Sequence, residues 1–205
     1  MARDRSPIVK QSRREGVALH PKAHKIMVNR TQAPGKSPHA RSGRLSDYGQ
    51  QLREKQKTKR MYGLLEKQFR KLITEANRSK GQTGEVLLEL LERRLDNVVY
   101  RAGFARSRRA SRQMVSHGHF ELNGRRVDIP SIRVKVGDEI VIRSRSKKLP
   151  LFQNHEDFMG DIAVDPVSWI AADTKKFTIK VTGLPKREEA EPGIQEQLIV
   201  EYYSR

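Results

Sequence analysis

One short segment has arginines at the spacing of a phosphate-binding helix face. No residue between Ser107 and Ser116 breaks a helix. At about 100° per residue, a single arc of about 100° holds Arg108, Arg109, Arg112 and Ser116. Because a guanidinium group donates two hydrogen bonds at once to phosphate, such an arc can bind a nucleic-acid backbone. The alternative is a solvated helix face, which the lack of interleaved acidic residues disfavours.

Residues on either side of this segment add further polar and basic groups. Arg106 precedes the expected helix and can contribute at its positively polarised N-terminal end. Asn123-Gly124 is a strong signal for a tight hairpin, and two arginines follow it directly. The candidate RNA-binding residues of this region are Arg106, Arg108, Arg109, Arg112, Ser116, His117, Asn123, Arg125 and Arg126.

Other constellations fit catalysis or metal binding poorly. Gly35-Lys36-Ser37 lacks the glycine five positions earlier that a phosphate-binding loop needs, since Arg30 stands there. His20 and His24 have helical i, i+4 spacing, but Pro21 lies between them. The chain has no cysteine, which excludes disulfides and thiolate-ligated zinc. We therefore expect no catalytic residues, no bound metal and no cofactor.

The charge distribution indicates a polyanionic partner. Among 205 residues, 42 Lys and Arg outnumber 24 Asp and Glu, which gives a formal net charge of +18. By region, the net charge is +15 over residues 1–80, +7 over 81–150 and −4 over 151–205. Nucleic acid is the first candidate, and it should lie against the first two thirds of the chain. A membrane is less favoured, because no apolar run approaches the roughly 18 residues of a spanning helix, and no signal peptide is expected.

The elements that must position these groups are helices followed by a small sheet. Residues 1–43 lack apolar periodicity, which predicts an irregular basic arm that orders on its partner. Ser46 is a good N-cap for a following helix, and an apolar stripe from Met61 to Ala76 predicts another. A further helix begins near Thr83. After Gly118 the apolar period changes to two, which predicts short strands.

Long motifs over nearly the whole chain match one known family. They include Arg44-Leu45-Ser46-Asp47-Tyr48-Gly49, Leu65-Glu66-Lys67-Gln68-Phe69-Arg70, Arg94-Leu95-Asp96-Asn97-Val98-Val99-Tyr100-Arg101-Ala102-Gly103-Phe104, Arg112-Gln113-Met114-Val115-Ser116-His117-Gly118, Asn123-Gly124-Arg125 and Leu198-Ile199-Val200-Glu201-Tyr202-Tyr203-Ser204. In these motifs the chain resembles the small-subunit ribosomal protein S-four family of bacteria and organelles. It resembles the form that lacks a zinc-binding cysteine cluster.

The resemblance implies an α+β fold in which a mostly helical domain accompanies a small S-four-type RNA-binding module. That module has two helices packed on a short β-sheet. The expected parts are a basic arm over 1–43, a helical domain over 44–93, the module over 94–158, and a C-terminal segment over 159–205 that packs back on the helical domain. The resemblance also implies RNA-facing roles for Arg44, Ser46, Tyr48, Arg53, Lys55, Gln56, Lys57 and Arg60. Tyr48 can serve equally in stacking on a base or in helix packing.

The function implied is that of a structural constituent of the small ribosomal subunit, in a cytoplasmic or organellar ribosome. Such a protein binds small-subunit ribosomal RNA early, nucleates assembly of the subunit body, contacts the neighbouring protein S-five and influences translational accuracy. Some members of the family also repress translation of their own messenger RNA. The rival from another class is an RNA-modifying enzyme that carries the same module, but no segment of adequate size remains for a catalytic domain. A regulator of messenger RNA or transcription is compatible with the ribosomal role.

Overall fold

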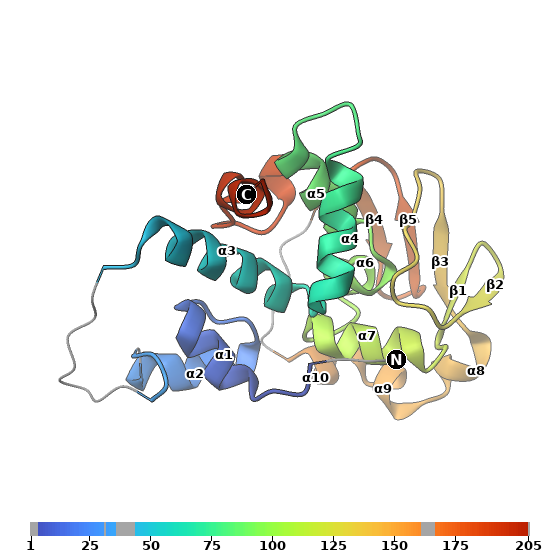
Figure 1. Ribbon diagram of the computed structural model, residues 1–205. Coiled ribbons are helices and arrows are strands. Elements are labelled where there is room, and N and C mark those ends of the chain that lie inside the picture. The colour runs from blue at the N-terminus through green and yellow to red at the C-terminus, as the bar shows by residue number, and fades with distance from the viewer. Residues whose placement is uncertain (1–3, 31, 36–43, 161–166, 205) are drawn as a thin grey trace. The chain divides into compact units, whose positions relative to one another are not determined.

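The chain forms two compact units. The computed structural model describes residues 4–30, 32–35, 44–160 and 167–204. The first unit comprises Met1–Leu87 together with Gly193–Arg205, and the second comprises Leu88–Pro192 (Figure 1). No helix in the described ranges is both long enough and apolar enough to cross a membrane. The two units are described separately below.

The first unit is helical. Its helices are α1 (Ile8–Glu15), α2 (Pro21–Asn29), α3 (Asp47–Met61), α4 (Glu66–Ala76), the first half of α5 (Thr83–Glu92) and α11 (Glu196–Tyr203). Ser46 caps α3 as predicted, because its hydroxyl oxygen accepts a hydrogen bond of 3.2 Å from the backbone N–H of Gly49. The negative charge of Asp47 lies in the first turn, where the helix dipole favours it.

Two packing contacts organise this unit. Helix α11 packs along α3, although the two helices come from distant parts of the sequence (Figure 1). Helix α1 packs against both α2 and α3. The apolar stripe of α4 is buried as its spacing predicts, with Phe69, Leu72, Ile73 and Ala76 all below a tenth exposed. Helices α1 and α2 are short elements within residues 1–43, the segment predicted to be an irregular basic arm with short elements.

The second unit contains a five-stranded antiparallel sheet in the order β2-β1-β3-β5-β4. Its strands are β1 (Phe120–Leu122), β2 (Arg125–Val127), β3 (Glu139–Ile142), β4 (Ile170–Asp173) and β5 (Thr178–Val181). Its helices are the second half of α5, α6 (Leu95–Arg101), α7 (Arg108–Ser116), α8 (Ser144–Lys147), α9 (Pro150–Gln153) and α10 (His155–Met159), with the short 3-10 helix η1 at Arg187–Glu189.

The β1–β2 hairpin has the turn that Asn123-Gly124 predicts. Leu122 pairs with Arg125, so that only these two residues form the loop. Asn123 has φ of 49° and Gly124 has φ of 75°, and two positive φ angles in succession define a type I′ turn. The Asn123 side chain also holds β3 in place, because its amide nitrogen donates to Asp138 Oδ1 and its amide oxygen accepts from the backbone N–H of Glu139.

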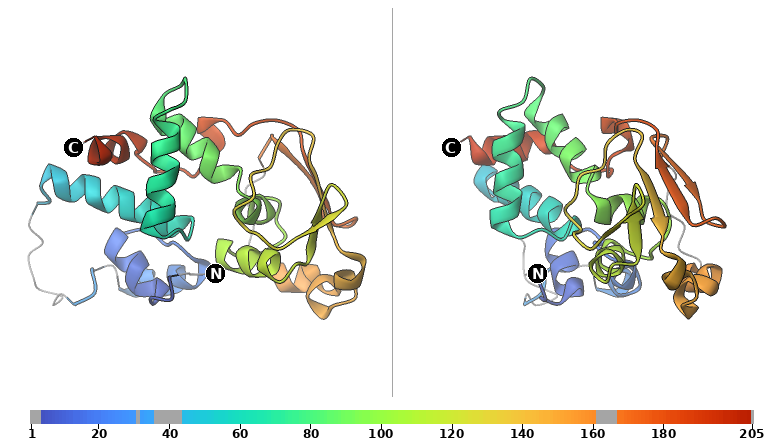
Figure 2. Two further views of the ribbon diagram at one scale, coloured as in Figure 1. Left: turned by 45° about the vertical axis from the view of Figure 1, so that its right-hand side comes forward. Right: turned by 90° about the vertical axis from the view of Figure 1, so that its right-hand side faces the viewer.

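Helices α6 and α7 pack on the sheet and share one apolar core with it (Figure 2). This core includes Leu95, Val98, Met114, Val115, Phe120, Ile140, Ile142 and Ile179. The arrangement confirms the expected α+β class and the expected packing of two helices on a sheet. Ser107 caps α7 through a hydrogen bond of 3.2 Å from the backbone N–H of Ala110.

The sheet continues past residue 158, where the sequence suggested that the module ends. One edge of β3 pairs with β1, and the other edge would leave its backbone groups unpaired without β5. Strands β4 and β5 therefore belong to the sheet unit, and only the segment from Gly193 onward packs in the helical unit. Val134 and Val136 belong to the period-two region after Gly118 that predicted short strands, but they lie in a loop before β3.

Candidate nucleic-acid interface

The candidate residues fall on both units, and in each unit some are exposed while others are held in ion pairs. On α7 the side opposite the arginine arc is buried, with Met114 only 5% exposed. Arg109 and Ser116 are exposed on this helix, whereas Arg108 and Arg112 are each 14% exposed at the side chain. The arginine face predicted from the sequence therefore divides into an exposed part and a largely covered part.

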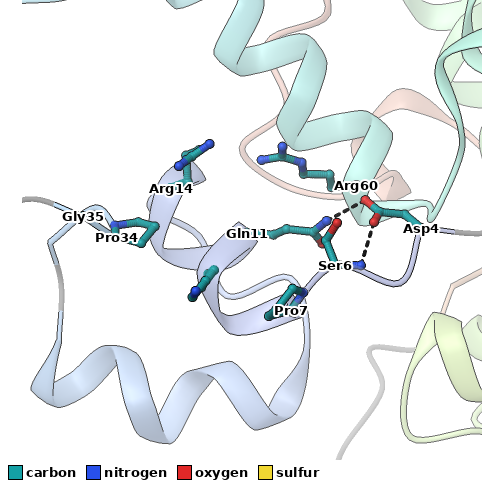
Figure 3. A pocket seen from close by; sticks show the side chains of 9 residues that line it. Asp4, Ser6, Pro7, Gln11, Arg14, Pro34, Gly35 and Arg60 are labelled. Atoms are coloured by element: carbon teal, nitrogen blue, oxygen red, sulfur yellow. Dashed lines mark hydrogen bonds between the residues drawn. The ribbon is translucent and has the colours of Figure 1, made fainter.

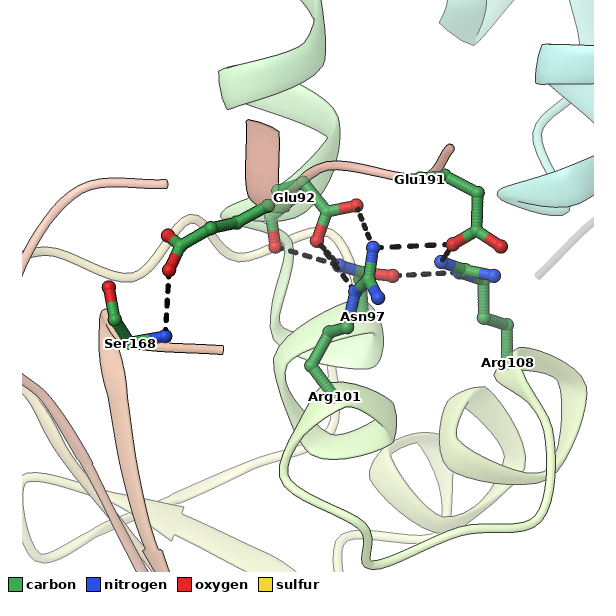
Figure 4. Close-up of polar contacts among 7 residues, drawn as sticks. Glu92, Asn97, Arg101, Arg108, Ser168 and Glu191 are labelled. Carbon is green, nitrogen blue, oxygen red and sulfur yellow. Dashed lines mark hydrogen bonds and ion pairs between the residues drawn. The ribbon is translucent and has the colours of Figure 1, made fainter. Parts of the chain in front are cut away.

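Arg108 is the centre of a polar network inside the second unit (Figure 4). Its Nε donates to Asn97 Oδ1 at 2.8 Å, and its Nη2 lies 2.5 Å from Glu191 Oε2. The same Glu191 oxygen accepts from Arg101 at 3.2 Å. The guanidinium group of Arg108 also lies 4.6 Å from the ring centroid of Tyr100. These contacts give Arg108 a structural role that its sequence position did not indicate.

Glu92 completes this network from α5. It is fully buried and accepts from Arg101 through both carboxylate oxygens, each at 3.1 Å. Asn97 Nδ2 donates to the same carboxylate at 2.7 Å. Burial acts to lower the pKa of Arg101, but the carboxylate of Glu92 outweighs it and raises that pKa. A buried pair of this kind costs desolvation, which the additional hydrogen bonds offset.

The segment that carries Glu191 is itself anchored to the sheet unit. The backbone N–H of Ser168 donates a hydrogen bond of 2.9 Å to Glu189 Oε1 (Figure 4). This bond lowers the pKa of Glu189. Glu191 therefore meets the two arginines from a fixed segment rather than from a loose loop.

Arg112 pairs with Asp96, which lies on the neighbouring helix α6. Arg112 Nη1 lies 3.5 Å from Asp96 Oδ2, while Arg94 binds both oxygens of the same carboxylate at 3.0 and 2.7 Å. Arg94 thus satisfies most of the charge of Asp96, and the longer contact leaves Arg112 the weaker partner. The Ser111 hydroxyl donates to the backbone carbonyl of Asp96 at 2.6 Å and joins the two helices.

The exposed polar and basic group of this unit lies along α7, just after it, and on the hairpin. Its members are Arg109, Ser116, His117, Arg125 and Arg126. Gly118 brings the hairpin and the helix together, because a Cβ atom there would lie 2.7 Å from Arg126 Nε. Exposed guanidinium groups on a helix and a hairpin can donate hydrogen bonds to phosphate oxygens.

His119, adjacent to this group, is half-buried and has an internal contact. Its Nδ1 lies 3.0 Å from the hydroxyl of Ser146, and its pKa is lowered by burial and then by His117 and Arg143. Arg106 also has internal contacts, since its Nη2 donates to the backbone carbonyl of Asp157 at 2.9 Å. Its guanidinium carbon lies 4.9 Å from the Phe158 ring centroid.

In the first unit, the basic residues of α3 meet acidic residues of α1 and α4. Glu15 is fully buried at the side chain and pairs with Arg53 at 3.2 Å and closely with Arg60. Lys55, only 4% exposed, donates to Glu66 Oε1 at 3.0 Å and lies 4.6 Å from the Tyr202 ring centroid. The burial of Lys55 is difficult to reconcile with a direct contact to RNA, so it positions α11 instead.

The remaining candidates of this unit vary in exposure. Lys57 donates to the backbone carbonyl of Gly193 at 2.7 Å and pairs with Glu54 at 2.8 Å. Arg44 and Ser46 are exposed, and Gln56 is half-buried. Tyr48 is 49% exposed, with its ring centroid 5.7 Å from that of Tyr202. It therefore packs against α11 with one side and leaves the rest of the ring accessible.

Two further basic side chains of the first unit were not among the residues predicted from the sequence to contact RNA. Lys10 and Arg14 are exposed on α1 and are four positions apart, which places them on one helix face. The spacing was present in the sequence, but without an apolar period no helix was assigned there. Across the described ranges no group of three or more His, Cys, Asp or Glu side chains could hold a metal ion.

Comparison with known proteins identifies two families that match parts of this chain. The family described as the S4 domain matches residues 93–140, which cover α6, α7, β1, β2 and the start of β3. The family described as the ribosomal protein S4/S9 N-terminal domain matches residues 3–92. The chain therefore combines a ribosomal-protein domain with an S4 RNA-binding domain.

Full-length relatives define the family more narrowly. Proteins named small ribosomal subunit protein uS4 are 48% identical in Roseiflexus sp. (strain RS-1), 48% in Heliobacterium modesticaldum and 50% in Herpetosiphon aurantiacus, over the whole of both chains in each case. The chain belongs to the uS4 family of ribosomal proteins. Members of this family are structural proteins, so the expectation that this chain is not an enzyme is confirmed.

Proposed function

We propose that this protein is a primary binder of small-subunit ribosomal RNA in the ribosome. The observation that carries the proposal is the exposed basic group along α7 and on the hairpin, within a matched S4 domain. Arg109, Arg125 and Arg126 donate to the phosphate backbone, and His117 contributes a further polar contact. The exposed residues Arg44, Ser46 and Tyr48 of the first unit supply a second contact region.

Covered arginines have a different role in this proposal. Arg108 and Arg112 fix α7 against α6 through Asn97, Glu191 and Asp96, so that the exposed side chains project from a rigid helix. The same holds for Arg53 and Arg60, which tie α3 to Glu15 on α1. Rigid positioning lowers the entropy cost of binding, since fewer side chains must be ordered on the RNA.

The test is binding of purified protein to its own small-subunit ribosomal RNA across a salt series, with unrelated RNA as competitor. Tight binding that resists the competitor supports a primary binding protein. Binding that unrelated RNA removes easily would show that charge alone drives association, and the primary role would be wrong.

Further roles follow from the family and rest on the same RNA contact. Early binding would nucleate assembly of the subunit body, so reconstitution that omits this chain should stall before later proteins join. Contact with the neighbouring protein S-five and an influence on translational accuracy are tested by cross-linking within assembled subunits and by misreading assays. Repression of its own messenger RNA is tested with a reporter that carries its leader. The bacterial relatives favour a ribosome of the bacterial cytoplasm.

A further inference from the structure

A pocket in the first unit lies among α1, the loop at residues 32–35 and the end of α3 (Figure 3). Its volume is about 400 Å³, within the range of small-molecule sites. The residues that matter for its chemistry are Asp4, Pro7, Lys10, Arg14, Pro34 and Arg60. Three of them are cationic and one is acidic, so the lining favours an anion.

The walls of the pocket are held by hydrogen bonds. Arg13 Nε donates to the backbone carbonyl of Gln32 at 2.9 Å, which joins α1 to the loop that carries Pro34. Asp4 accepts from Gln11 Nε2 at 2.6 Å and from the backbone N–H of Ser6 at 2.8 Å. These bonds form one side of the pocket (Figure 3). The cavity is therefore shaped in advance rather than created by a ligand.

The cationic groups differ in how they are used by the protein. Arg60 is paired with the buried carboxylate of Glu15. Lys10 and Arg14, by contrast, are exposed, and their side chains form no hydrogen bond or ion pair with any residue in the described ranges. Two cationic side chains on one helix face, beside a preformed cavity, are better explained as a phosphate-binding pair than as a solvated surface.

The pocket also has surfaces that suit a planar ring. Pro7 and Pro34 present apolar rings on different walls, and Ser6 and Gln11 also belong to the lining, on the side of Asp4. RNA is recognised most specifically where an unstacked base enters a protein pocket while its phosphate meets basic side chains. We propose that this pocket holds one unstacked nucleotide of the RNA, with its phosphate on Lys10 and Arg14 and its base between Pro7 and Pro34.

This inference rests on the proposed RNA binding and adds a named contact to it. Ser6→Phe fills the pocket without changing any charge, and its backbone N–H still donates to Asp4. Ser6→Ala is the matched control, because it removes the hydroxyl without filling the cavity. Loss of one base contact should lower affinity for the ribosomal RNA about 10-fold for Ser6→Phe, with little change for Ser6→Ala.

A double-mutant cycle distinguishes loss of the pocket contact from a general loss of positive charge. Lys10→Gln should weaken RNA binding. The double variant Lys10→Gln and Ser6→Phe should bind RNA little more weakly than Ser6→Phe alone, because both substitutions remove contacts to the same nucleotide. Lys25→Gln removes an equal charge from the exposed face of α2, outside the pocket, and its effect should add to that of Ser6→Phe. Effects of Lys10→Gln and Ser6→Phe that simply add would overturn the proposal.

Chemical probing identifies the source of the nucleotide. Base reactivity in the complex should change at one or two nucleotides between the wild-type protein and Ser6→Phe, and not for Ser6→Ala. Adenosine monophosphate in excess should compete with RNA more strongly than inorganic phosphate does. Equal competition would mean an anion site without a base and would overturn the proposal. Wild-type protein that fails to bind ribosomal RNA would refute the proposed function itself, whereas normal binding by Ser6→Phe would refute only the pocket.

Discussion

Replacing Arg109 by glutamine should make the slope of log K against log salt for RNA binding shallower, by the contribution of about one phosphate contact. Arg109 is exposed on α7, and each neutralised phosphate contributes about 0.7–0.9 to the slope of log K against log salt. Between 50 and 200 mM salt, one such contact changes the affinity by about 3-fold. The ratio of wild-type to Arg109→Gln affinity should therefore shrink by about 3-fold over that range.

Filter binding or fluorescence anisotropy with the ribosomal RNA measures the slopes of the wild-type protein and of Arg109→Gln. Arg108→Gln is the informative comparison, because Arg108 lies within the same arc but is held by Asn97 and Glu191. Its replacement should lower the thermal midpoint of the protein and leave the salt slope close to that of the wild type. The reasoning is refuted if Arg108→Gln flattens the slope as much as Arg109→Gln does, or if Arg109→Gln leaves the slope unchanged.

Three further substitutions test the internal contacts. Gly84→Ala places a Cβ atom 2.5 Å from Glu196 Cγ and 2.9 Å from Glu196 Cβ, so it should destabilise the protein by about 1–3 kcal/mol in urea unfolding. Glu92→Ala leaves Arg101 without its buried partner and should cost about 3–5 kcal/mol in the same assay; a loss below 1 kcal/mol would show that the network is dispensable. Burial acts to raise the pKa of Glu66, but hydrogen bonds from Lys59, Tyr203 and Lys55 bring it to about 2, below the ordinary 4.5. Because the folded-state pKa is depressed, its contribution to stability is present above pH 4.5 and is lost as the pH falls towards 2, and Glu66→Gln should remove that part of the acid sensitivity seen by circular dichroism.

Local signals in the sequence predicted local structure well. Ser46 and Ser107 marked the starts of α3 and α7, because a side-chain oxygen that can accept from the first helical turn is a chemical requirement at that point. Asn123-Gly124 predicted a two-residue hairpin, because both residues tolerate positive φ. The buried side of α7 followed from the helical period alone.

Partners that are distant in sequence limited the prediction of the site. Arg108 was assigned to an RNA-facing arc, yet its carboxylate partner Glu191 lies 83 positions away. Nothing in helical periodicity could indicate that this acid folds over that arc. Phe177, with φ of 58°, is another case, since only packing in the assembled sheet unit stabilises an aromatic residue in that conformation. The exposure and ion pairing of a candidate side chain depend on such distant partners, and residue type alone does not predict them.

The discontinuity of the helical unit has a consequence for the order of events during synthesis. A ribosome that translates this chain makes α3 first and must then add all of Leu88–Pro192 before the partner helix α11 emerges. The sheet unit is continuous in sequence and can fold as soon as it leaves the exit tunnel. The usual order of folding during synthesis, in which the N-terminal domain folds first, is therefore reversed. Until α11 emerges, a nascent chain presents α3 without the helix that covers it, and Lys55 and its neighbours are exposed to nearby polyanions.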